Sequence, residues 1–183
     1  MSQQTDAELI AEFKDGNRNG FNELVRRYQK KVYWIARRIV GSHDEADDVT
    51  QDVFVKVYEK LSAFRGDSEF YTWLYRIAVN TSFSVTSKRR FKDLFQYNEV
   101  EDRVDIEQEA DKALLQKEYQ SLLEDAIAEL PKQQKAVFQL RYFDELQYQE
   151  IAKIMKRSEG AVKANYFFAL NKIKSMMQKE YQL

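Results

Sequence analysis

The chain contains one proline and five glycines among 183 residues, so very few positions interrupt a helix. Apolar residues recur at three- and four-residue spacing through most of its length, which is typical of amphipathic helices. We therefore expect an all-α protein. The absence of cysteine and the single histidine, His43, leave almost no residues for disulfides, thiolate chemistry, zinc catalysis or a Ser-His-Asp arrangement.

No apolar run approaches the roughly 18 residues that span a bilayer, and no secretory leader opens the chain. We expect a soluble cytoplasmic protein without membrane insertion of its own. No nucleophile is paired with a base and an orienting group, so an enzyme is the least expected class. The sequence suggests no catalytic residue, no metal and no cofactor.

Charge and periodicity divide the chain into three parts. Residues 91–112 hold three Lys/Arg against eight Asp/Glu and lack a sustained apolar stripe, which is typical of a linker. Helical periodicity is clear in residues 1–90 and again in residues 113–183. We expect two small helical domains joined by a flexible acidic linker.

Capping patterns predict where the first helices begin and end. Thr5 with Glu8 forms a capping box that opens a short helix ending at Gly16. A long helix is expected from about Gly20 to Val40, with Gly41 as its stop. Ser42 with Glu45 opens a third helix that buries one face, made of Ala46, Val49, Val53, Val57 and Leu61.

Residues 64–90 combine aromatic rings, cations and short polar side chains. After a loop at 65–68, helical spacing gives a core stripe of Phe70, Trp73, Leu74, Ile77 and Thr81. The opposite stripe holds Thr72, Arg76, Asn80, Phe83, Ser87 and Arg90. Cations with a flat ring suit the phosphates and bases of a nucleic-acid strand. A plain amphipathic core helix with a basic outer face explains the same periodicity.

Residues 148–174 contain two helical patterns separated by a short polar turn. The second pattern begins after Ser158, a plausible N-cap, and its apolar residues are Val162, Tyr166, Leu170 and Ile173. Pro131 is expected as the first residue of a preceding helix. This spacing predicts a helix-turn-helix, whose second helix enters the DNA major groove. An ordinary αα-hairpin is the alternative, because short helix pairs are common.

Two stretches carry a family resemblance: DEADDVTQDVFVKVYEKLSAFRGDSEFYTWLYRIAVNT, and LPKQQKAVFQLRYFDELQYQEIAKIM followed by GAV. In this order, with an acidic linker between them, they resemble the bacterial RNA polymerase sigma factors of the extracytoplasmic-function (ECF) group of the sigma-70 family. The resemblance implies a sigma factor that binds core RNA polymerase and directs promoter recognition, promoter melting and transcription initiation. A stress or envelope response is the usual setting of such factors.

The resemblance also assigns roles to residues. Domain 1–90 is similar to sigma region 2, which binds core polymerase and reads and melts the minus-ten element. Domain 113–183 is similar to sigma region 4, which reads the minus-thirty-five element. The implied minus-ten contacts are Phe64, Arg65, Ser68, Tyr71, Thr72, Arg76, Asn80, Phe83, Lys88, Arg89 and Arg90. The implied core polymerase contacts are Asp47, Asp48, Gln51, Asp52, Phe54, Lys56 and Tyr58. The implied minus-thirty-five contacts are Lys156, Arg157, Ser158, Gly160, Ala161, Lys163, Ala164, Asn165 and Phe168.

The implied partners are the clamp helices of the largest polymerase subunit, the polymerase flap, promoter DNA and an anti-sigma factor, often membrane-anchored. Trp73 is expected to support the loop before it rather than to touch DNA. Where relatives carry more arginine in the recognition helix, this chain has Asn165 and Phe168, so the upstream promoter sequence does not carry over. The linker is either a mimic of a nucleic-acid backbone in the polymerase channel or a plain tether.

Two other functions compete with this one. A helix-turn-helix regulator that acts without polymerase needs only the C-terminal domain, and it predicts tight specific binding by the free protein. A helical interaction protein with no nucleic-acid role leaves the basic and aromatic stripe of residues 64–90 unexplained.

Overall fold

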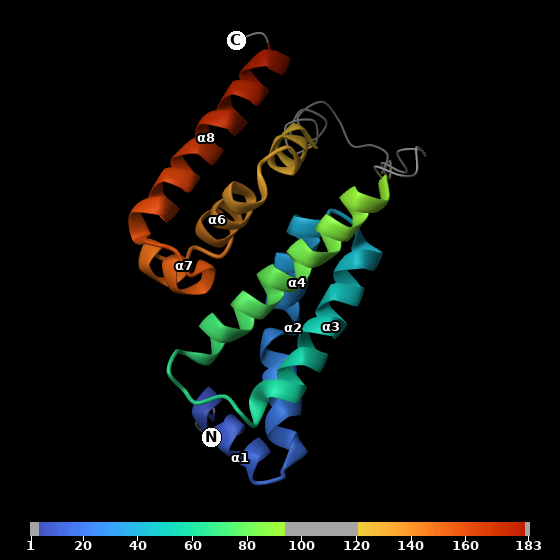
Figure 1. The fold of residues 1–183 in the computed structure, drawn as a ribbon, viewed down its shortest axis with the longest axis vertical. Coiled ribbons are helices and arrows are strands. Elements are labelled where there is room, and N and C mark those ends of the chain that lie inside the picture. Colours follow the sequence, from blue (N-terminus) through green and yellow to red (C-terminus); the bar gives the residue numbers. More distant parts are fainter. Residues whose placement is uncertain (1–3, 94–120, 182–183) are drawn as a thin grey trace, which may run out of the picture.

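The computed structural model describes residues 4–93 and 121–181. The described residues contain helices and turns and no strand, so the all-α fold is confirmed. Figure 1 shows the helices in chain order. They are α1 (Asp6–Lys14), α2 (Arg18–Val40), α3 (His43–Leu61), α4 (Phe70–Asp93), α6 (Lys132–Tyr142), α7 (Tyr148–Met155) and α8 (Glu159–Tyr181), with a further helical stretch at residues 121–128.

Helices α1 to α4 pack around an apolar core. The five α3 residues expected to be buried are all at most 1% exposed. They meet inward side chains of α2, such as Val32 and Ile35, and of α4, such as Leu74. Each fully buried aliphatic side chain of this size contributes roughly 1.5–3 kcal/mol through removal from water. The same buried cluster also takes in side chains of α6, α7 and α8.

The helix ends follow the capping residues. Thr5 Oγ1 accepts a hydrogen bond from the Glu8 amide, and the Glu8 carboxylate accepts one from the Thr5 amide, so the capping box is confirmed. Gly41 ends α2 at a φ of 90°, a left-handed conformation that glycine adopts without steric cost. Ser42 Oγ accepts from the Glu45 amide at the start of α3.

The C-terminal unit is a helix-turn-helix backed by α6 and by residues 121–128. Its small core contains Ile127, Leu130, Phe138, Ala169 and Ile173. Leu170 of α8, which was expected to face the core, is 40% exposed, and its neighbour Ala169 is buried instead.

The physical reason is rotational drift. Two consecutive steps of four residues turn a side chain about 80° away from the starting face, whereas a step of four and a step of three nearly restore it. The inward stripe of α8 is therefore Val162, Tyr166, Ala169 and Ile173, of which Tyr166 is half-buried. Pro131 is also one position off, because it is the N-cap of α6 and not its first residue.

The two units lie against each other. Helix α7 contacts α4, and α6 contacts α2. Ile151 and Ile154 of α7 and Leu140 of α6 belong to the same hydrophobic cluster as the core of the N-terminal unit. Helix α4 continues to Asp93, beyond the expected boundary at residue 90, and the rest of the acidic linker lies outside the described residues.

In the part of the chain that the structure describes, no helix is long and apolar enough to cross a membrane. The same residues hold no group of three His, Asp or Glu side chains placed to bind a metal ion.

Candidate nucleic-acid interface

The loop between α3 and α4 is held from both sides. The ring of Phe64 lies 5.0 Å from the Trp73 ring and 6.1 Å from the Phe70 ring, measured between centroids. Lys14 Nζ of α1 donates a 2.7 Å hydrogen bond to the Phe64 carbonyl. Gly66 turns the loop at a φ of 77°. Phe64 and Trp73 thus anchor a short loop whose Arg65 side chain is exposed.

Helix α4 presents only part of the expected nucleic-acid stripe. Asn80 and Ser87 are exposed, and Arg76 and Phe83 are half-buried. Thr72, which was expected to face outward, is only 2% exposed. The reason is tertiary, because α4 is packed against α2, α3 and α7. The side chains of Lys88, Arg89 and Arg90 lie outside the described residues.

Two of the residues expected to contact the minus-ten element, Arg76 and Tyr71, bind the C-terminal unit directly. Arg76 Nη2 donates to the Lys153 carbonyl at 2.7 Å, and Arg76 Nε donates to the Ile154 carbonyl at 3.3 Å. Tyr71 Oη donates to Glu150 Oε1 at 2.5 Å. Partial burial and then this hydrogen bond raise the pKa of Tyr71 above its ordinary value. These hydrogen bonds join residues almost 80 positions apart, so no local sequence pattern predicts them.

The acidic face of α3 is open to solvent. Four polar side chains of this face are exposed, namely Asp47, Asp48, Gln51 and Asp52. The opposite face of α3 is buried. Phe54 is 9% exposed. These four polar residues form a continuous surface that a basic partner can approach.

Two further residues expected to contact polymerase are engaged within the N-terminal unit. Lys56 Nζ donates to Thr81 Oγ1 at 3.1 Å. The Tyr58 ring packs edge-on against Phe13 and Phe21, with centroids 5.2 and 5.1 Å away. In this structure both side chains therefore hold α3 against its neighbours.

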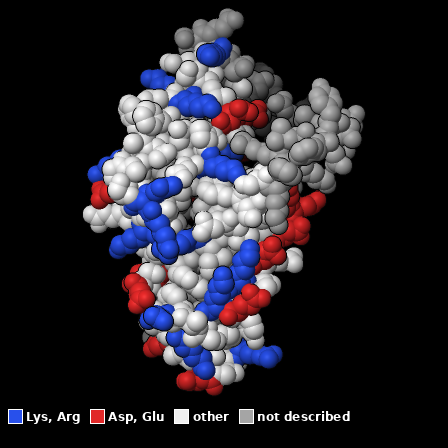
Figure 2. Space-filling model, viewed as in Figure 1, with Lys and Arg blue, Asp and Glu red and all other residues white. Residues whose placement is uncertain are grey.

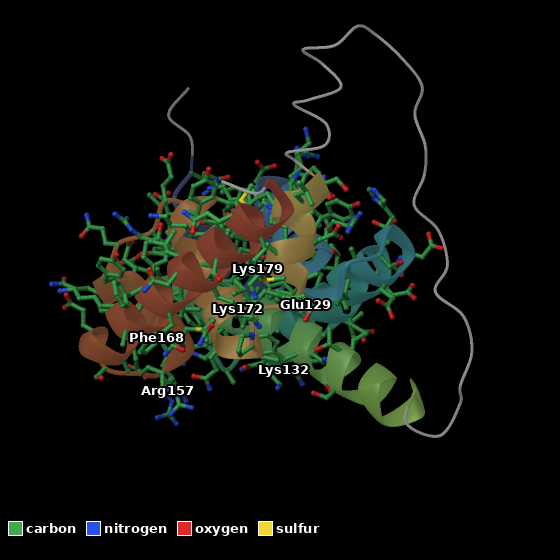
Figure 3. The ribbon with its side chains drawn as sticks, turned by 90° about the horizontal axis from the view of Figure 1, so that it is seen from above. Glu129, Lys132, Arg157, Phe168, Lys172 and Lys179 are labelled. Atoms are coloured by element: carbon green, nitrogen blue, oxygen red, sulfur yellow. The ribbon has the colours of Figure 1, made fainter. Side chains whose placement is uncertain are left out.

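The helix-turn-helix has a well-capped second helix. Ser158 Oγ accepts from the Ala161 amide at 3.2 Å. Lys156 ends α7 in a left-handed conformation, with φ 52°. Lys156 and Arg157 are exposed in the turn, and Figure 3 shows Arg157 pointing away from the helices.

The outward face of α8 is mixed in character. Lys163 Nζ pairs with Glu159 Oε1 at 2.7 Å, and this hydrogen bond raises the pKa of the Lys163 ammonium. Asn165 Nδ2 donates to the Ala161 carbonyl at 2.8 Å. Gly160, Ala164 and Phe168 are exposed, Ala161 is half-buried, and Figure 3 shows where Phe168 lies. Phe167, 60% exposed, adds a second ring that the sequence analysis missed.

A cleft of about 1010 Å³ separates the α3–α4 loop from the helix-turn-helix. Its walls carry residues of both units, namely Gly66, Asp67, Arg76, Lys153, Lys156 and Arg157. Figure 2 shows Lys and Arg side chains gathered over the region where Figure 1 places α7 and the start of α8. The surface around the cleft thus combines cations from two DNA-reading candidates.

Comparisons with known proteins agree with this architecture. The family profile described as Sigma-70 region 2 matches residues 24–91, and that of Sigma-70, region 4 matches residues 120–173. The RNA polymerase sigma-H factor of Pseudomonas aeruginosa is 33% identical over 97% of this chain and 96% of its own length. The ECF RNA polymerase sigma-E factor of Escherichia coli is 37% identical over 97% of each chain.

Solved structures match the fold. The structure of CnrH in complex with the cytosolic domain of CnrY aligns with a TM-score of 0.71 and 24% identity, over 95% of this chain and 97% of that one. The sigma factor RpoE of Bartonella quintana, solved with the anti-sigma factor NepR, aligns with a TM-score of 0.68 and 21% identity, over 86% and 96%.

The fold, the helix-turn-helix and both profile matches define a transcription initiation factor of the sigma class. The chain belongs to the sigma-70 family and, within it, to the ECF group. This outcome favours a sigma factor over a stand-alone helix-turn-helix regulator.

Proposed function

We propose that this sigma factor recruits core RNA polymerase through α3, melts and reads the minus-ten element with the α3–α4 loop and α4, and reads the minus-thirty-five element with α8. Residues 1–90 and 113–183 are the two functional units. The chain performs no catalysis itself. The observation that carries the proposal is the presence of two separate surfaces of opposite charge, the exposed acids of α3 and the cations around the cleft.

The chemistry of each surface fits its role. Carboxylates such as Asp48 and Asp52 suit a basic protein partner, because complementary charges steer association. Lys156 and Arg157 suit phosphates, and the exposed rings of Phe167 and Phe168 suit the thymine methyl group by apolar contact. Asn80 suits hydrogen bonding to an unpaired base edge.

The site of action is the cytoplasm, where promoter DNA and polymerase are found. An anti-sigma factor is the proposed regulator, because solved relatives of similar fold are bound to such proteins. A stress or envelope response is the proposed setting. The acidic segment between the two units is proposed to run through the polymerase channel.

The test is in vitro transcription from a promoter library with core polymerase of the same source, with and without the protein. We expect transcripts that depend on the protein. Tight sequence-specific duplex binding by the free protein, without any such transcripts, would favour a stand-alone regulator and overturn the proposal.

Two variants separate the surfaces. Asp48→Ala with Asp52→Ala is expected to weaken binding to core polymerase by about tenfold or more, since a charge-paired interface loses attraction. Glu59→Ala is the matched control, because Glu59 is another exposed acid of α3 that is not among the proposed contacts.

Asn80→Ala is expected to reduce open-complex formation while core binding stays intact. Loss of core binding instead would mean that the DNA face is misplaced.

A further inference from the structure

The polar side chains in the first half of α8 are engaged within the C-terminal unit. Asn165 Nδ2 donates to the Ala161 carbonyl at 2.8 Å. The Lys163 ammonium lies 2.7 Å from Glu159 Oε1 and 5.6 Å from the centre of the Tyr148 ring. Asparagine and lysine are the residue types that read adenine and guanine by hydrogen bonds in the major groove. This part of α8 therefore offers few free polar groups to base edges.

The outward surface of α8 carries two aromatic rings instead. Phe167 is 60% exposed and Phe168 is 57% exposed, and their ring centroids are 5.9 Å apart. At about 100° per residue, they lie on either side of the direction opposite to the buried Val162 and Ala169. Ala164, one turn before Phe168, is exposed on the same face. A contiguous exposed apolar surface of this kind usually marks a binding site.

This ring patch, Ala164 with Phe167 and Phe168, follows a cationic turn. Lys156 and Arg157 are exposed just before α8, in the region where Figure 2 shows Lys and Arg side chains gathered. In a helix-turn-helix, the second helix meets base edges in the major groove, while neighbouring cations hold the phosphates. An apolar patch beside phosphate-binding cations is therefore directed at the bases.

Among its donors and acceptors, the major groove presents one apolar group, the C5-methyl group of thymine. We propose that the ring patch determines promoter specificity by contacting thymine methyl groups, so that the upstream element is selected by thymine and not by hydrogen bonds to guanine. This inference rests on the proposed role of α8 in reading the minus-thirty-five element. It adds the chemical group of the DNA that α8 recognises.

Recognition of a methyl group is tested by removing the methyl group and nothing else. The upstream element is first selected by transcription with core polymerase and the full-length protein, from templates with a randomised promoter region. Each thymine of the selected element is then replaced in turn by deoxyuridine, which keeps every hydrogen-bonding group of thymine. We expect at least one replacement to raise the protein concentration for half-maximal open-complex formation by about fourfold, the factor for loss of one buried methyl contact.

A variant without the rings assigns this effect to the patch. Phe167→Ala with Phe168→Ala should need more protein on the thymine template and should not respond to deoxyuridine, because the contact is already lost. Leu170→Ala is the matched control, since Leu170 is an exposed apolar residue of α8 outside the ring patch. This control should keep the full response to deoxyuridine.

Cytosine at the responsive position tests the same contact by adding a methyl group. The methyl group of 5-methylcytosine occupies the place of the thymine methyl group, whereas the hydrogen-bonding groups are those of cytosine. We expect the natural chain to recover about fourfold when 5-methylcytosine replaces cytosine, and the variant without the rings to recover nothing. Lack of recovery in the natural chain would contradict recognition of the methyl group.

The remaining outcomes separate this inference from the proposed function. Transcripts that depend on the protein, from a selected element without thymine or without any response to deoxyuridine, would overturn the inference and leave the sigma activity standing. Weaker binding of the ring-free variant to core polymerase in the absence of DNA would make the patch a protein-docking surface, which also overturns the inference. If no template yields transcripts that depend on the protein, the proposed sigma activity is wrong, and the inference is wrong with it.

Discussion

At the scale of single residues, the tightest constraint in the N-terminal unit is Gly20. A Cβ atom at this position would lie 2.2 Å from the Leu9 carbonyl oxygen, so α1 and α2 cross at a distance that only glycine permits. We expect Gly20→Ala to lower the free energy of unfolding by about 1–3 kcal/mol, as overpacking of a tight contact does. Urea denaturation measures the change.

Gly160→Ala is the matched control for this substitution. No atom lies within 4 Å of a Cβ built on Gly160, which is in the first turn of α8. Alanine should raise the stability there, by up to about 1 kcal/mol, because it is the better helix former. Equal effects of the two substitutions would contradict the close crossing of α1 and α2.

Asp144, which follows α6, gives the stability of the chain a pH dependence. Burial raises the pKa of its carboxyl group from the ordinary 3.8 to about 6, while the charges of Arg38 and Lys31 act in the opposite direction. The folded chain therefore binds this proton more tightly than the unfolded chain does. The stability contributed by the protonated group is complete below about pH 4 and is lost as the pH rises through about 6.

Asp144→Asn should abolish this part of the pH profile. We expect the wild type to lose stability relative to the variant between pH 4 and pH 7, by on the order of 2 kcal/mol, measured as urea midpoints. Glu145→Gln, a change at the exposed neighbouring acid, should leave the profile unaltered. Parallel profiles for wild type and Asp144→Asn would mean that the carboxyl group is not buried in solution.

At the scale of elements, what the sequence could predict was local. The capping box at Thr5, the stop at Gly41 and the buried stripe of α3 follow from neighbouring residues, and all were predicted. The hydrogen bond from Tyr71 to Glu150 could not be predicted, because it depends on α7, far along the chain. Leu170 was misassigned because small angular errors accumulate along an apolar stripe.

The candidate site, too, could be predicted only where it depends on neighbouring residues. Composition and spacing picked out the loop after α3, the acidic face of α3 and the turn before α8, since each is a short stretch of characteristic residues. The hydrogen bonds from Arg76 to main-chain carbonyls of α7 could not be predicted from side-chain patterns. Such contacts are fixed by tertiary geometry alone.

At Lys156, in the turn between α7 and α8, one substitution is expected to raise the stability and to weaken DNA binding. Lys156 has a φ of 52°, where a residue with a Cβ atom costs roughly 1–2 kcal/mol relative to glycine. Lys156→Gly should therefore raise the urea midpoint. It should also reduce the salt dependence of binding to duplex DNA of arbitrary sequence by about one unit of slope, because one phosphate contact is lost.

Lys156→Asn is the companion variant, since asparagine tolerates the left-handed conformation and carries no charge. It should show the same loss of slope with a smaller gain in stability. An unchanged slope in both variants would remove Lys156 from the DNA surface.

At the scale of the whole molecule, a buried polar side chain lies in the contact between α6 and α2, where Gln139 Nε2 donates to the Trp34 carbonyl. Gln139 is 1% exposed, and its Oε1 atom lacks a partner. Replacing such a group with an apolar side chain of similar shape is often neutral or stabilising. We expect Gln139→Met to leave the free energy of unfolding unchanged or to raise it, measured by urea denaturation.

Gln133→Met is the control, because Gln133 is exposed in the first turn of the same helix. A urea midpoint for Gln139→Met well below that of Gln133→Met would contradict the expectation that the unpartnered Oε1 atom is costly.

The acceptors of the Arg76 guanidinium are carbonyls of the main chain. No substitution of the Lys153 side chain can delete its acceptor, whereas any substitution of Arg76 deletes both donors. Tolerance of mutation across this contact should therefore be one-sided. A deep mutational scan is expected to find residue 153 permissive and residue 76 restricted, so that the outer face of α7 can diversify freely while its contact with α4 is kept.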